Sequence, residues 1–210
     1  MTNIPRGVPA YRSQSYASLE KIARRVRSRI APDIAIHDAL RGVEIFEGLD
    51  GYQVTVGSGN IPLKYGVESL PLGFEAHAHF SSDEGAIVVA MAEETYGDLE
   101  AGVPRALFTL AHEIGHAVLH AQELVDRGLG PPSAASLARP VAAHRIFLDT
   151  EWQANGFASA LLIPAEGLRF LENGGANLDE FLLQEQFSVS RVAAEVRLKT
   201  YRARRHELTY

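Results

Sequence analysis

The stretch that decides the fold is Pro104-Arg105-Ala106-Leu107-Phe108-Thr109-Leu110-Ala111-His112-Glu113-Ile114-Gly115-His116-Ala117-Val118-Leu119-His120. Proline suits the first turn of a helix, because the N–H group that it lacks would have no intrahelical partner there. Apart from Gly115, no helix breaker follows before Gly128. The sequence therefore predicts one helix that runs from Pro104 through Glu123.

Two histidines of this helix are spaced to bind the same ion. His112 and His116 lie four positions apart, which places them on one helix face with Cβ atoms about 5–6 Å apart. Their ring nitrogens can aim at one point and hold zinc at about 2.0–2.1 Å each. Glu113 lies beside them on the helix circumference, where a carboxylate can act as a general base on bound water without ligating the metal. A structural set of hydrogen-bonded side chains is the alternative.

A catalytic zinc site needs a third protein ligand, because such sites usually have three and keep one position open. The best candidate is Glu151, in a second predicted helix that begins near Asp149 or Thr150. If this helix packs against the histidine helix, Glu151 faces the metal, and Asn155 one turn later can orient Glu151 or a histidine. Spacing alone leaves an alternative open, in which Glu151 only interacts with the helix dipole.

Composition limits the classes of protein. The chain has 210 residues, of which 46% are hydrophobic and 22% charged, so it can bury a core. Its net charge of −6 does not suit a nucleic-acid binder, and the absence of cysteine excludes disulfides and thiolate metal sites. No apolar run has the length of a membrane helix or a signal peptide. We therefore expect a cytoplasmic protein that does not bind membranes.

The pattern predicts an α+β fold with a small antiparallel sheet beside a mainly helical half that carries the histidine helix. The expected strands are residues 43–46, 52–56 and 86–90, with Asp50-Gly51 as the hairpin turn between the first two. Helical spacing of apolar residues predicts a helix over residues 18–30. We place a loose arm at 1–17, the core at 18–165 and C-terminal helices at 166–210 that form one compact unit with it. Residues 128–140, rich in Gly, Pro and Ser, are the best candidate for a mobile loop.

The succession of predicted helices and turns in the C-terminal segment resembles a helix-turn-helix. We expect helices over about 164–173, 178–187 and 189–201, the last with a basic end. A DNA-reading helix is one interpretation. Because Glu195 lies on that helix and basic residues at a helix end complement its dipole, we favour a structural pair that supports the site, without direct DNA binding.

For three other histidines we favour interpretations that give them no role at the metal site. His77 and His79 would share one face of a strand, but no third ligand is evident nearby, so we expect exposed polar positions. His144 precedes Glu151 and could approach the site as a hydrogen-bond donor, which we consider the less favoured interpretation.

Two blocks of the sequence together resemble the ImmA/IrrE family of metallo-endopeptidases. The first is residues 108–120, which match an aromatic-Thr-Leu-Ala lead into HExxH with a further histidine four residues later. The second is residues 151–164, which match E-x-[E/Q]-A-[N/D]-x-F-A followed by Leu-Leu-Met-Pro. Two positions depart from the pattern: Ile163 replaces methionine, and Gly156 replaces a larger residue.

Carried over by position, the resemblance implies that His112, His116 and Glu151 are the metal ligands and that Glu113 is the general base. The implied fold is a minimal gluzincin-like one and the implied metal is zinc. Manganese and iron remain alternatives, because an imidazole–carboxylate set accepts several first-row ions. His120 also falls on the pattern, but it is rotated by about 80° from His112, so we expect it to pack against or hydrogen-bond a ligand.

The resemblance implies limited proteolysis of a protein substrate, a helix-turn-helix transcriptional repressor encoded nearby, in response to stress. The Ala86–Ala90 strand is the candidate sheet edge on which an extended substrate pairs. The alternative function is a DNA- or partner-binding regulatory protein in which the metal site is structural or inactive.

Overall fold

The computed structural model describes residues 7–127 and 144–208. The predicted mobile loop at 128–140 lies outside these ranges. The helices are α1 (Tyr16–Ile30), α2 (Gly42–Glu47), α3 (Glu93–Glu100), α4 (Pro104–Leu119), α5 (Ala121–Arg127), the short 3₁₀ helix η1 (Ile146–Leu148), α6 (Thr150–Leu162), α7 (Ala165–Asn173), α8 (Glu180–Phe187) and α9 (Arg191–Arg204). The strands are β1 (Gln53–Val56), β2 (Gly59–Glu68), β3 (Ala76–Ser81) and β4 (Ala86–Ala92).

The four strands form one sheet in the order β1-β2-β4-β3. The chain turns back from β3 into β4, and β4 inserts between β3 and β2, so that β2 and β4 run parallel while the other two pairs are antiparallel. The predicted α+β class is confirmed, although the sheet is mixed. The prediction that residues 86–90 form the sheet edge is wrong, because the nearly all-buried β4 lies inside the sheet and β3 is the edge strand beside it.

The first predicted strand is wrong, because residues 43–46 belong to helix α2. Ile45, Phe46 and Leu49 are all fully buried, and an extended strand would send Ile45 and Phe46 to opposite faces. The Asp50-Gly51 turn does exist, with Gly51 at φ +76°, but it joins α2 to β1 instead of closing a hairpin. The hairpin is formed by β1 with β2, a strand that the sequence pattern did not reveal.

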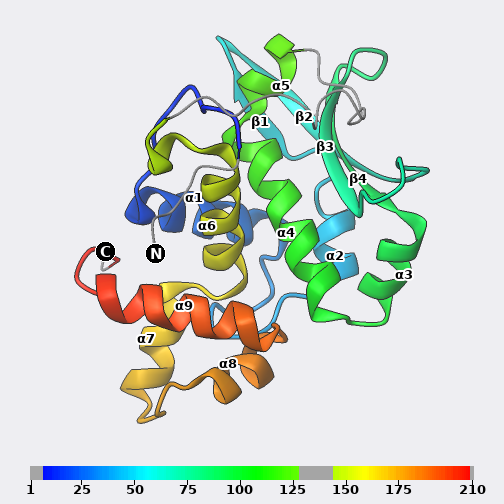
Figure 1. Cartoon of the computed structure of the whole chain (residues 1–210). Helices are drawn as coiled ribbons and strands as arrows, with labels where there is room; N and C mark the ends of the chain where they lie inside the picture. The colour runs from blue at the N-terminus through cyan, green and yellow to red at the C-terminus, as the bar shows by residue number, and fades with distance from the viewer. Residues whose placement is uncertain (1–6, 128–143, 209–210) are drawn as a thin grey trace.

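Helix α4 lies at the centre of the molecule, between the sheet and α6, and α1 lies on the far side of α6 (Figure 1). Glycine allows the close approach of α4 and α6, since a Cβ on Gly115 would lie 3.1 Å from both Ala154 Cα and Phe157 Cδ1. Gly156 similarly makes room for α1, because its Cβ would lie 2.6 Å from Leu19 Cδ1. The departure from the family pattern at this position thus accompanies close packing against α1.

The segment predicted as a loose arm is hydrogen-bonded to the core over its described part. Ala10 N donates to Leu148 O at 2.6 Å, and Thr150 N donates to Val8 O at 3.1 Å. The chain just before α1 therefore runs alongside the start of α6, which is the helix that carries Glu151.

The C-terminal helices α7–α9 form close to the predicted positions and lie below α4 and α6 in Figure 1. A buried ion pair between Arg197 of α9 and Glu20 of α1 ties them to the core. The same two side chains bond the backbone between α6 and α7, since Arg197 Nε donates to Ile163 O at 2.7 Å and Glu20 accepts from Ala165 N at 3.2 Å. Within the described ranges, no helix has both the length and the apolar character needed to cross a bilayer.

Candidate metal centre

Helices α4 and α6 bring His112, His116 and Glu151 together. The two Nε2 atoms lie 3.0 Å apart, and each lies 3.3 Å from one oxygen of Glu151. Ligands at about 2.0–2.1 Å on a tetrahedral zinc are separated by about 3.3–3.4 Å, so these distances are close to one face of such a site. Among the described residues, this is the one group of three such side chains whose donor atoms could share a metal ion.

The start of α6 positions Glu151. Asp149 caps this helix, with Oδ1 accepting from Trp152 N at 2.8 Å, while its Oδ2 accepts from Gly7 N at 2.7 Å. His144, which the sequence left as a less favoured donor for the site, lies 3.0 Å from the same Oδ2. Asp149, which is held by Gly7 and His144, therefore fixes the helix turn from which Glu151 reaches the histidines.

Charge favours ionised groups in the ligand triangle, by which we mean His112, His116 and Glu151. Burial alone would raise the pKa of Glu151, but hydrogen bonds and positive charge from the two histidines hold it far below its ordinary value. Burial alone would lower the pKa of His116, but Glu151 and the charges of Glu113 and Asp149 raise it above 6.5. A cation bound here would compete with a proton for Nε2 of His116.

Glu113 lies beside the triangle and faces the sheet edge. Its Oε2 accepts a hydrogen bond of 2.8 Å from Ala78 N in β3. This N–H therefore points away from β4, toward α4. The carboxylate expected to act as a base is thus held between the triangle and the outer edge of β3.

Asn155 and His120 contact the other ring nitrogens of the two histidines. His112 Nδ1 lies 3.2 Å from Asn155 Oδ1, and His116 Nδ1 lies 3.1 Å from His120 Nδ1. The predicted long helix ends just before His120, which is its C-cap. Burial, followed by the nearby charge of His116, lowers the pKa of His120 to about 3, so this ring is neutral.

Two residues near the site were not found from the sequence. Gln153 is buried, and its Oε1 lies 3.1 Å from His120 Nε2. The sequence offered two signals for it, the [E/Q] position of the family pattern and a polar residue among the apolar positions of α6. Gly7 packs on Glu151, since a Cβ there would lie 2.8 Å from both Cγ and N of Glu151. Nothing in the local sequence indicates that contact, because the two residues are far apart in the chain.

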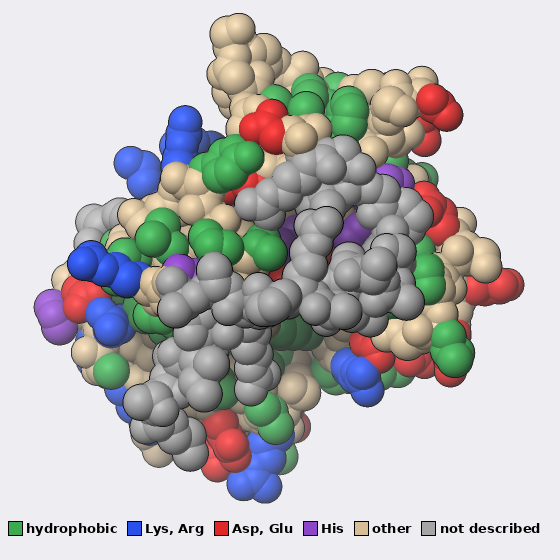
Figure 2. All heavy atoms as spheres, turned by 45° about the horizontal axis from the view of Figure 1, so that its top comes forward, with side chains coloured by type: hydrophobic (Ala, Val, Ile, Leu, Met, Phe, Trp, Pro, Cys, Tyr) green, Lys and Arg blue, Asp and Glu red, His purple; other side chains and the backbone are tan. Residues whose placement is uncertain are grey.

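His77 and His79 lie on β3 with their rings stacked 5.9 Å apart. The prediction that they are exposed is wrong, because His79 is buried and His77 half-buried. Val88 and Ala90, their neighbours on β4, are buried as well, so this sheet face is covered. Figure 2 shows histidine side chains near the middle of one molecular face, with lysine and arginine mostly toward its rim.

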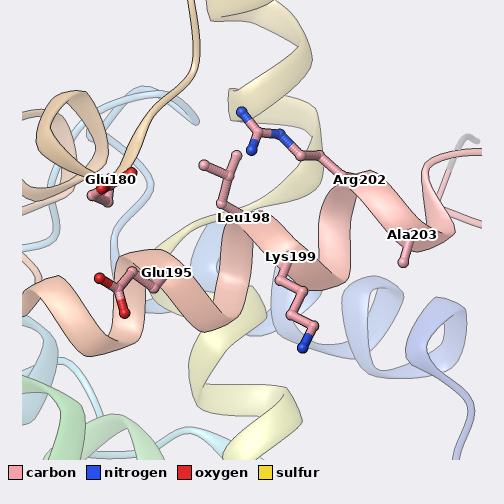
Figure 3. A pocket seen from close by; sticks show the side chains of 6 residues that line it. All are labelled: Glu180, Glu195, Leu198, Lys199, Arg202 and Ala203. Atoms are coloured by element: carbon pink, nitrogen blue, oxygen red, sulfur yellow. The ribbon is translucent and has the colours of Figure 1, made fainter.

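A separate hollow of about 540 Å³ lies along α9, next to the start of α8. Its lining mixes two carboxylates with two cations: Glu180, Glu195, Leu198, Lys199, Arg202 and Ala203. Leu198 and Arg202 point to one side of α9 and Lys199 to the other (Figure 3). The hollow contains none of the residues of the ligand triangle.

Residues 100–199 match the family model Peptidase_M78, the IrrE N-terminal-like domain. The matched range contains the whole ligand triangle and Glu113, which confirms the resemblance drawn from the two sequence blocks. No curated protein matches the chain. The family match and the geometry together support a metallopeptidase-type function.

Proposed function

We propose that the protein is a zinc-dependent endopeptidase making limited cuts in a protein substrate, because residues 100–199 match the model of the IrrE N-terminal-like domain. The observation that carries the proposal is the ligand triangle with Glu113 beside it. Two imidazoles and one carboxylate, held by two packed helices, are the donor set of many catalytic zinc sites.

We propose His112, His116 and Glu151 as the ligands. When bound, zinc supplies Lewis-acid chemistry that polarises a carbonyl and lowers the pKa of water. Manganese or iron could bind the same donors, because nitrogen and oxygen ligands do not discriminate strongly among these ions.

Glu113 is proposed to move the proton. It accepts a proton from the attacking water and then delivers it to the leaving amine. The hydrogen bond from Ala78 N holds one carboxylate oxygen in place and leaves the other for this work. A fixed carboxylate reduces the reorganisation that proton transfer requires.

The outer edge of β3 is proposed to bind the substrate. An extended peptide can add to an edge strand through main-chain hydrogen bonds. Glu113 lies next to that edge, since it accepts a hydrogen bond from Ala78 N, so a peptide that pairs with β3 through its other main-chain groups would pass the triangle. This assigns to β3 the role that the sequence suggested for β4.

The substrate class is proposed from the family resemblance: a helix-turn-helix repressor encoded next to this gene, cut as part of a stress response. The test is to incubate the zinc-loaded protein with that repressor and identify fragments by mass. We expect one or a few defined cuts, and no cuts with Glu113→Gln although zinc stays bound. Undiminished cleavage by Glu113→Gln would rule out the mechanism.

A DNA-binding role has less support from the C-terminal helices. Arg191 pairs with Glu195, Arg204 with Glu207 and Arg205 with Glu172, so several basic side chains of this region are already next to carboxylates. A gel shift at two salt concentrations separates the two functions. Salt-sensitive DNA binding without metal-dependent cleavage would favour the regulatory protein.

A further inference from the structure

A buried chain of hydrogen bonds leads from His116 into the protein interior. It passes from His116 Nδ1 to His120 Nδ1 at 3.1 Å, and from His120 Nε2 to Gln153 Oε1 at 3.1 Å. His120 is 2% exposed and Gln153 1% exposed, so water does not compete along it. Each group in the chain must therefore find its donor or acceptor within the protein.

The amide of Gln153 sets the direction of the chain. Its Nε2 donates to two backbone carbonyls, Arg12 O at 2.8 Å and Phe147 O at 2.9 Å. The reverse amide orientation would place Oε1 against two carbonyl oxygens, and neither of them has a hydrogen to donate to it. Oε1 therefore faces His120, where it can only accept.

The orientation of Gln153 determines which nitrogen donates and which accepts on the two histidine rings. His120 must carry its proton on Nε2 to donate to Gln153, and a neutral imidazole with one N–H has its other nitrogen free to accept. His120 Nδ1 thus accepts from His116 Nδ1–H. The remaining nitrogen, His116 Nε2, is left with a lone pair directed at the ligand triangle.

We propose that Gln153 and His120 are positioning residues that fix the ring proton of His116 on Nδ1 and so prepare Nε2 for the metal. This inference rests on the proposed function only for the identity of the ion. The chain of hydrogen bonds ends at the carbonyls of Arg12 and Phe147. The segment before α1, which contains Arg12, therefore helps to keep Nε2 of His116 free for the metal.

The test uses the full chain and two measurements. Zinc affinity is measured by competition with a chelator, and the ring tautomers are read by two-bond ¹H–¹⁵N correlation in metal-free protein at the alkaline end of a pH titration, where the ring signals no longer change with pH. In the wild type we expect the proton of His116 on Nδ1 and that of His120 on Nε2. Gln153→Met keeps the size of the side chain, and we expect mixed tautomers and zinc binding weaker by about 10–100-fold.

The matched control is Gln186→Met, because Gln186 also donates to a backbone carbonyl, His37 O at 2.7 Å, but lies outside the site. We expect it to keep wild-type zinc affinity and tautomers. If a substitution only destabilises the fold, the molecules that remain folded keep the wild-type ring tautomers. The spectrum therefore separates a positioning role from structural support.

If Gln153→Met does not fold, His120→Phe carries the test, because it removes the acceptor for His116 and keeps the two bonds of Gln153 to the backbone. We expect the same loss of zinc affinity. A proton on Nε2 of His116 in the wild type, or wild-type affinity in the folded variant, would overturn the proposal. A wild type that binds no zinc contradicts the proposed function instead, and the tautomers still decide the direction of the chain.

Discussion

The two histidines of the ligand triangle have different surroundings. His116 is backed by buried groups, His120 and then Gln153, whereas His112 is backed by Asn155, an exposed residue that solvent reaches. Glu151 lies across from both and its side chain is 40% exposed, against 17% for each histidine. The triangle thus has a buried side, whose proton positions the protein must determine, and an exposed side, where water can replace a lost partner.

The largest effect is expected from removing a ligand on either side. His116→Ala or His112→Ala should weaken zinc binding by about 10³-fold, because the ligands share a large binding free energy. The measurement is zinc affinity by chelator competition, with thermal melting as the control for folding. Near wild-type affinity in either variant would remove that histidine from the ligand set.

Gly7→Ala should also impair the site, through Glu151. The added methyl would lie 2.8 Å from the Cγ and N atoms of Glu151, so the start of α6 must shift. We expect a loss of about 1–3 kcal/mol in the free energy of unfolding and weaker zinc binding. Chemical denaturation and zinc titration measure these two effects. The matched control is Gly97→Ala, since a Cβ there meets nothing within 4 Å.

Asn155→Ala sharpens the comparison of the two sides. Because Asn155 is exposed, water can accept the hydrogen bond from His112 Nδ1 in its place. We expect zinc binding to weaken by less than about threefold, well below the loss expected for Gln153→Met. Equal losses in the two variants would show that burial does not distinguish the two sides.

The pH dependence of zinc affinity should report on His116. Its pKa lies above the ordinary 6.5, and the proton must leave Nε2 before zinc can bind. Affinity should therefore be constant above the raised pKa and fall by about tenfold per pH unit below it. Titrations between pH 5 and 9 measure this, and an affinity that stays flat down to pH 5 would contradict the raised value.

The sequence predicted the parts of the site that depend on local spacing. Pro104 and the four-residue interval of His112 and His116 determine the helix face that carries both histidines, and Asp149 is a recognisable cap for the helix of Glu151. Each of these signals lies within a few turns of the helix that it predicts. The meeting of Glu151 with the histidines was implied by the family resemblance.

The remainder depends on contacts between distant residues. No local pattern places β4 between β2 and β3, because strand order is set by long-range pairing. The contact of Gly7 with Glu151, and the bond from Gln153 to Arg12 O, likewise join residues far apart in the chain. Residues 43–46 had strand-forming side chains, yet burial of both Ile45 and Phe46 favoured a helix.

The central claim is that Glu151 binds the metal while Glu113 serves as the base. The most direct measurement is the zinc stoichiometry and affinity of two matched variants, Glu151→Gln and Glu113→Gln, each of which replaces one carboxylate by its amide. We predict that Glu113→Gln binds one zinc with wild-type affinity and that Glu151→Gln binds far more weakly. Wild-type zinc binding by Glu151→Gln, or loss of zinc by Glu113→Gln, would contradict the assignment.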